Sequence, residues 1–160
     1  MHRYQILIEY VGTNFIGWQK QSKGQSIQKL IQIKVSKLLK EQINLVGSGR
    51  TDAGVHAVEQ SAHFDCKKKI KNLSKFLQSI NFFLNIKLIS ITNIKNKIQI
   101  QFKSQSFLQQ QVRSMVGCLK YLAEKKWDLK KFENVFKSKK RTLCAPPAPA
   151  HGLFLERVIY

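Results

Sequence analysis

The pattern of apolar and polar residues changes its period several times along the first part of the chain. From Arg3 to Tyr10 every second residue is aromatic or aliphatic, which predicts a half-buried strand. From Ser26 to Leu39 the apolar residues recur every three or four positions with lysines between them, which predicts a helix of about four turns. Residues 43–46 and 55–64 then predict two strands around a glycine-rich turn at 47–54.

The rest of the chain continues this alternation of helices and strands. Apolar spacing predicts a short helix at 73–80 and a strand at 86–92, so residues 3–92 have the β-α-β-β-α-β order of a ferredoxin-like unit. A strand at 98–102, a helix at 108–122 and a helix at 129–136 follow, with Asp128 as the expected N-cap of the last helix. Three prolines predict a loop between Cys144 and Gly152, before a final strand at 153–160.

These elements indicate an α+β protein with two lobes. The first lobe is expected at residues 1–92 with ferredoxin-like β-α-β-β-α-β topology. The second, at residues 93–160, has only the order β-α-α-β, which is too little for another complete unit of the same kind.

The charge of the chain points to a polyanionic partner. Its 160 residues include 28 Lys and Arg against 9 Asp and Glu, a formal net charge of +19. The excess is present in both halves, with 13 basic and 5 acidic residues in 1–80, and 15 and 4 in 81–160. A drift of the codons toward AT explains part of the lysine content, but it does not explain the scarcity of carboxylates. Nucleic acid is therefore the leading partner, and an anionic membrane surface is a poor second.

Several other classes of protein do not fit the sequence. No apolar stretch approaches the roughly 18 residues of a membrane helix, and residues 1–10 lack the features of a secretory signal, so we expect a cytoplasmic protein. The three cysteines are too far apart for a disulfide framework or a CxxC pair. The four histidines form no HExxH motif, and we predict no metal.

The glycine-rich turn carries the candidate chemistry. It places a single carboxylate, Asp52, among small residues that let the backbone approach a ligand closely. Arg50, two residues earlier, could pair with Asp52 and keep it ionised as a nucleophile or base. The same pair could also be a salt bridge that only pins the turn. Spacing alone favours this structural role, because Arg-x-Asp is common and no second catalytic carboxylate is visible.

The full string of residues adds more than the spacing. Residues 49–57, GRTDAGVHA, resemble the catalytic motif of the tRNA pseudouridine synthase A (TruA) family. Residues 10–21 look like the opening loop of that family, and Gln60 and Phe64 fit its Q-x-x-x-F strand pattern. Residues 106–117 resemble its SFL-x-x-MVR helix, and residues 148–153 resemble its APA-x-GL ending. The resemblance therefore extends over both ends of the chain and most of what lies between them.

This resemblance implies an isomerase with a pseudouridine synthase fold, whose first lobe is catalytic. Such an enzyme converts uridine to pseudouridine in the anticodon stem-loop of tRNA, without a cofactor or metal, as a homodimer. By resemblance, Asp52 is the nucleophile that attacks the uracil ring or the anomeric carbon of the ribose. Arg50 would fill the space left by a flipped nucleotide and pair with Asp52, while Thr51 and Arg113 would also bind the substrate.

The chain departs from the family pattern most strongly in the second lobe. Between the strands at 86–92 and 98–102, family members carry a long stretch with a Y-x-Y segment, whose tyrosine stacks on the target uracil. Here five polar residues, 93–97, bridge the gap, and none of the four tyrosines lies in such a context. Val11 and Gln111 are smaller departures. The leading hypothesis is an internally shortened enzyme of this type. The alternatives are a basic RNA-binding remnant without activity and a ferredoxin-like module that acts on other proteins.

Overall fold

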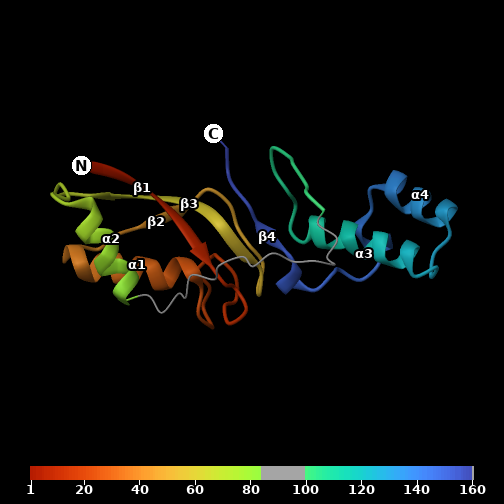
Figure 1. The fold of residues 1–160 in the computed structure, drawn as a ribbon, viewed down its shortest axis with the longest axis horizontal. Helices are drawn as coiled ribbons and strands as arrows, with labels where there is room; N and C mark the ends of the chain where they lie inside the picture. The colour runs from red at the N-terminus through yellow and green to blue at the C-terminus, as the bar shows by residue number, and fades with distance from the viewer. Residues whose placement is uncertain (84–99, 160) are drawn as a thin grey trace. The chain divides into compact units, whose positions relative to one another are not determined.

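The structure, a computed structural model, describes residues 1–83 and 100–159 of the chain (Figure 1). Contacts between Cα atoms divide the chain into two compact units. The first combines Met1–Ser90 with the C-terminal segment Leu153–Tyr160, and the second is Ile91–Gly152. The first unit therefore joins two segments that lie far apart in the sequence.

The first unit is built on a mixed sheet centred on its longest strand. Strand β3 (His56–Cys66) pairs antiparallel with β1 (His2–Tyr10) along nearly its whole length and with the short β2 (Leu45–Gly47) near its C-terminal end. Strand β4 (Phe154–Leu155) pairs parallel with the first residues of β3. Because Ala57 is paired with β1 as well as with β4, β4 lies on the same side of β3 as β2 does.

Two helices, α1 (Ile27–Leu39) and α2 (Leu73–Phe83), lie against one face of this sheet (Figure 1). Ser26 caps α1 by accepting a hydrogen bond from the backbone N–H of Lys29, 3.3 Å away. The apolar stripe of α1 packs against the inward side chains of the strands, which buries the core of the unit. The fully buried members of this core are Trp18, Tyr10, Phe64, Ile27, Ile31, Ile43, Leu45, Val35 and Cys66.

The second unit consists of two helices and a proline-rich segment. Helix α3 (Gln111–Ala123) packs against α4 (Leu129–Ser138), and short 3-10 helices occur at Arg141–Leu143 and Ala150–Gly152. Asp128 caps α4, because its carboxylate accepts the backbone N–H of Lys131 at 2.7 Å. This confirms the N-cap that the sequence predicts.

The proline-rich segment is attached along α3. The backbone groups of Arg113 and Ala148 are joined by a 2.9 Å hydrogen bond, and the N–H of Ala145 reaches the Sγ atom of Cys118 at 3.4 Å. A side chain at Gly117 would overlap the backbone carbonyl of Pro146. The two segments can approach this closely only because residue 117 lacks a Cβ atom.

The predicted elements agree with the structure in the first 83 residues and differ at the C-terminus. The mixed α+β architecture agrees with the fold class that the sequence predicts. The predicted strand at 86–92 lies outside the described residues, as does the first part of the one at 98–102, whose described residues 100–102 form no strand. The final strand is only two residues long and pairs within the first unit, whereas its position in the sequence assigns it to the second lobe. No helix in the described part of the chain is long and apolar enough to cross a membrane.

Candidate functional site

The turn between β2 and β3 contains three of the predicted site residues. Thr51 and Asp52 are half-buried in this turn, whereas Arg50 is exposed. The backbone N–H of Val55 donates to the carbonyl oxygen of Asp52 at 3.2 Å and closes the turn. The carbonyl of Thr51 accepts the backbone N–H of Trp18 at 3.0 Å, so the loop that follows β1 is joined to the residue before Asp52.

The loop after β1 fits the turn because two of its residues are glycines. A Cβ atom at Gly12 would overlap the carbonyl of Val55, and one at Gly17 would come 2.5 Å from the carbonyl oxygen of Thr51. Gly17 also has a φ of +106°, a conformation that side-chain-bearing residues rarely adopt. Glycine at both positions therefore allows this loop to support the backbone on either side of Asp52.

Tyr10 holds the side chain of Thr51. The Tyr10 hydroxyl lies 2.8 Å from the Oγ1 atom of Thr51, and its ring stacks on Trp18 with 6.1 Å between the ring centroids. Burial raises the pKa of Tyr10 to about 12, against a smaller opposite effect of the hydrogen bond to Thr51. The phenol is therefore protonated at neutral pH and stays available for this hydrogen bond.

Gln60 fixes the backbone on the other side of Arg50. Its Nε2 atom donates to the carbonyl oxygen of Gly49 at 2.7 Å, and its side chain is fully buried on β3. Its Oε1 atom is also buried and has no hydrogen-bond partner among the described residues. A buried acceptor without a partner lowers the stability of the fold by about 1–3 kcal/mol. The hydrogen bond from Nε2 to Gly49 is therefore formed although the Oε1 atom of the same side chain has lost its contact with water. The sequence matches Gln60 only to a strand pattern and gives no sign of this contact.

His56 connects the start of β3 to the loop and to β4. Its Nδ1 atom accepts the backbone N–H of Gly12 at 3.2 Å, and its ring stacks on Phe154 with 4.7 Å between centroids. The backbone N–H of His56 donates to the carbonyl of Leu153 at 3.1 Å. Because Nδ1 accepts a hydrogen bond, the imidazole is unprotonated at this nitrogen. The histidine of the motif thus has a structural contact on each side.

The expected ion pair between Arg50 and Asp52 is not formed. Both residues are described, and their side chains do not form a salt bridge with one another. The guanidinium of Arg50 is exposed to water, where an ion pair gains little free energy and loses side-chain entropy. In the structure, the turn is therefore held by Tyr10, Gln60 and Trp18 rather than by this pair.

Arg113, the remaining predicted site residue, belongs to α3 in the second unit. Its Nε atom donates to the carbonyl oxygen of Ala148 at 2.7 Å, which anchors the proline-rich segment. The structure therefore brings Arg50, Thr51 and Asp52 together in one turn and fixes Arg113 by contacts within its own unit.

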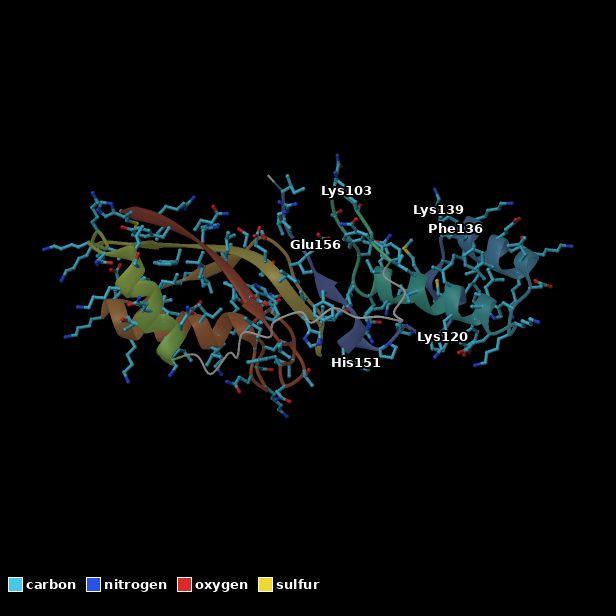
Figure 2. All side chains as sticks on the ribbon, in the orientation of Figure 1. Lys103, Lys120, Phe136, Lys139, His151 and Glu156 are labelled. Carbon is cyan, nitrogen blue, oxygen red and sulfur yellow. The ribbon has the colours of Figure 1, made fainter. Side chains whose placement is uncertain are left out.

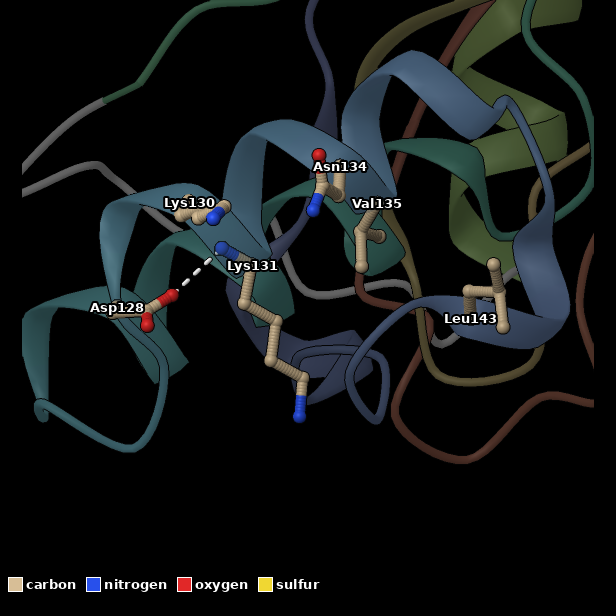
Figure 3. A pocket seen from close by; sticks show the side chains of 6 residues that line it. All are labelled: Asp128, Lys130, Lys131, Asn134, Val135 and Leu143. Carbon is tan, nitrogen blue, oxygen red and sulfur yellow. Dashed lines mark hydrogen bonds between the residues drawn. The ribbon is translucent and has the colours of Figure 1, made fainter.

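Basic side chains project from the surface of each unit (Figure 2). In the second unit, a cavity of about 360 Å³ next to α4 is lined by lysines as well as by polar and apolar groups (Figure 3). Lys131 extends from this helix with its Nζ atom 5.2 Å from the centre of the Trp127 ring. The described residues include no group of three or more His, Cys, Asp or Glu side chains that could hold a metal ion. The full lining of the cavity is Asp128, Lys130, Lys131, Asn134, Val135 and Leu143.

Comparisons with known proteins agree with the motif. A family model described as tRNA pseudouridine synthase matches the chain over residues 6–85 and 75–160. The tRNA pseudouridine synthase A of Pelagibacter ubique (strain HTCC1062) is 51% identical over 246 residues, in an alignment that covers all of both chains. The protein of the same name from Orientia tsutsugamushi (strain Ikeda) is 52% identical over 81 residues, which are 51% of this chain and 28% of that protein.

The Pelagibacter alignment is longer than the 160 residues of this chain. That relative therefore carries residues within the aligned span that have no counterpart here, in agreement with an internally shortened chain. The family model matches the chain in two regions, and the Pelagibacter relative is similar to it over the full length of both. The chain therefore belongs to the tRNA pseudouridine synthase family.

Proposed function

We propose that this chain isomerises uridine to pseudouridine in the anticodon stem-loop of tRNA, with Asp52 as the nucleophile. One observation carries this assignment: Asp52 is half-buried in a turn whose backbone is fixed by groups from β3 and the loop after β1, and whose Thr51 side chain is held by Tyr10 of β1. A carboxylate held in this way loses little entropy when it meets a positioned substrate. Membership of the family supplies the reaction.

The reaction needs only one carboxylate and no net redox change. The bond between N1 of uracil and the anomeric carbon breaks, and a bond between C5 and that carbon forms. The proton lost from C5 is balanced by one gained at N1, so the product is an isomer of the substrate. Asp52 assists by adding its oxygen to the uracil ring or to the anomeric carbon and leaving again when the new bond forms. The reaction needs no oxidant or reductant, and the proposal includes no cofactor.

The other site residues contribute to binding. The exposed Arg50 occupies the space that a flipped nucleotide leaves in the RNA stack, and its charge attracts phosphates. Thr51, fixed by Tyr10, presents its backbone and hydroxyl beside the nucleophile. Arg113 contributes positive charge from α3, with its Nε atom held by Ala148. In this proposal, residues 1–92 together with β4 form the catalytic lobe, and the rest of residues 93–160 forms the shortened second lobe.

The alternative is a basic RNA-binding protein that has lost activity. It is favoured by the absence of the tyrosine segment that family members use to stack the target base. The two functions differ in one measurable quantity, which is the amount of pseudouridine formed.

The test compares the wild type with Asp52→Asn on an anticodon stem-loop RNA. Pseudouridine formation should be abolished by the substitution, while RNA affinity stays within a few fold, because many lysines contribute to binding. Asp65→Asn is the matched control, since Asp65 lies on β3 and pairs with Arg3 at 2.8 Å, away from the turn. A wild type that binds RNA but forms no pseudouridine would support the inactive alternative. An unchanged rate in Asp52→Asn would contradict the role of Asp52.

The proposal also includes a homodimer in the cytoplasm, where tRNA substrates are found. Apolar side chains of the second unit are exposed, among them Leu108 at 78% and Leu119 at 37%. A partner that covers residues 98–124 would remove this surface from water.

A further inference from the structure

A second cavity, of about 270 Å³, lies in the first unit next to the turn that carries Asp52. Its walls come from the loop after β1, from the start of α1 and from β2 with the residues around it. No carboxylate lines it, and its one charged residue is Arg50. Asp52 is not part of its lining. The residues that line it are Trp18, Gln19, Gln28, Asn44, Leu45, Val46, Gly47, Gly49 and Arg50.

Most polar side chains of this cavity are not used within the protein. Gln19, Asn44 and Arg50 are exposed, and their side chains form no hydrogen bond with any described residue. Gln28 differs, because its amide accepts from the backbone of Lys20 and donates to that of Leu45, both at 2.8 Å. Gln28 is thus a structural wall, whereas the other three side chains are available to a ligand.

Trp18 adds a donor to the same cavity. The residue is only 2% exposed, yet its indole N–H has no acceptor among the described residues. A Cβ atom at Gly47 would overlap this nitrogen, so the glycine keeps the space beside the indole free of protein atoms.

These groups define the chemistry of a ligand. A cavity with one guanidinium, two amides, an indole N–H and no carboxylate accepts an anionic group that is rich in hydrogen-bond acceptors. Val46, which is 41% exposed, provides apolar surface for a flat ring. The volume of about 270 Å³ is slightly below the roughly 300–1,000 Å³ typical of ligand sites, so the cavity has room for one nucleotide at most.

We propose that this cavity binds one nucleotide of the RNA strand, adjacent to the nucleotide that reaches Asp52. The inference rests on the proposed function, since RNA is its ligand. Arg50 and Asp52 are two positions apart in the chain, and their Cα atoms are at most about 7 Å apart. The subsite and the nucleophile are therefore close enough to contact neighbouring nucleotides, with the Arg50 guanidinium on a phosphate and the amides of Gln19 and Asn44 on a base edge.

The test measures RNA binding rather than turnover. The double variant Gln19→Ala/Asn44→Ala is titrated against a fluorescent anticodon stem-loop RNA at two salt concentrations. Two lost hydrogen bonds should weaken binding by roughly 5- to 30-fold. The salt dependence should stay unchanged, because neither side chain carries charge. Gln42→Ala is the matched control, since Gln42 is exposed, lies two residues before Asn44 and does not line the cavity.

A second variant, Trp18→Phe, removes the indole N–H and keeps an aromatic ring in the core. The smaller ring in the core should also lower the melting temperature, so binding is measured at a temperature at which the variant is folded, where it should weaken a few fold. Affinities of both variants equal to that of Gln42→Ala would overturn the subsite. These titrations measure RNA binding alone, so their outcome does not depend on pseudouridine formation. A failure of the proposed catalysis is detected separately, by the comparison of the wild type with Asp52→Asn.

Discussion

Residues far from Asp52 in the sequence set its position. Tyr10, at the end of β1, forms a hydrogen bond with the side chain of Thr51. Gln60, in the middle of β3, donates a hydrogen bond to the carbonyl oxygen of Gly49. Both side chains are buried, so neither contact competes strongly with water. The geometry of the turn is therefore set by core residues, and substitutions in the core should reach the site through these two hydrogen bonds.

Tyr10 makes the stability of the first unit depend on alkaline pH. Its pKa is raised from 10.0 to about 12 in the folded protein, so the unfolded chain loses this proton first as the pH rises. The contribution to stability is complete below pH 10 and is lost as the pH rises through 12. A shift of two units corresponds to about 2.7 kcal/mol at most.

The substitution Tyr10→Phe isolates this effect. Chemical unfolding of the wild type and Tyr10→Phe at several pH values between 9 and 12 gives the difference in their free energies of unfolding. This difference should shift in favour of the variant as the pH rises, because phenylalanine does not ionise. The lysines titrate in both proteins and cancel. A difference that stays constant from pH 9 to 12 would show that Tyr10 is not the group responsible.

At the scale of elements, the attachment of the proline-rich segment to α3 depends on close approach. Gly117 lies within the helix, where replacement by alanine normally stabilises by about 1 kcal/mol. Here the added methyl group would overlap the carbonyl of Pro146, and backbone atoms must move to accommodate it. Packing and helix propensity therefore act in opposite directions at this residue.

We expect Gly117→Ala to lower the free energy of unfolding by about 1–3 kcal/mol, because overpacking outweighs helix propensity. Gly152→Ala is the control, since a Cβ atom there would meet no atom within 4 Å. Thermal unfolding of both variants measures the difference. A stabilised Gly117→Ala would mean that the segment moves away from α3 at little cost.

At the scale of the whole molecule, the net charge of +19 should control RNA binding. Each phosphate that a lysine or arginine neutralises releases counterions, so affinity falls steeply with salt. Several such contacts predict a loss of about 10³-fold or more between 50 and 200 mM salt. Titrations of the anticodon stem-loop RNA over this range provide the measurement. A flat response would remove the electrostatic argument for tRNA as the partner.

The exposed apolar residues of the second unit predict self-association. A homodimer that covers residues 98–124 should bury more than roughly 1,000 Å² in total, the usual minimum for a specific interface. Light scattering at micromolar concentration should give twice the mass of the 18.5 kDa chain. Leu108→Lys, at the most exposed of these positions, should shift the protein toward monomer. A wild-type monomer that binds no hydrophobic dye would refute the dimer.

The sequence by itself determined the local elements and the family. The alternation of apolar and polar residues predicted β1, the spacing of apolar residues by three or four positions predicted α1, and Asp128 predicted the start of α4. Each of these signals depends only on residues that are close together in the chain. The motif at 49–57 identified the family for a similar reason, since it is a contiguous string that needs no tertiary contact to be read.

Only the tertiary structure decided which distant groups meet. Local spacing suggested a pair between Arg50 and Asp52, but solvent exposure of the guanidinium leaves such a pair little free energy to gain. Position in the sequence likewise assigned the final strand to the second lobe, whereas β4 pairs with β3 in the first unit. The contact of Gln60 with Gly49 has no local signal at all. Pairing across long stretches of chain is set by burial and backbone hydrogen bonding in the folded state, and a one-dimensional pattern does not specify these partners.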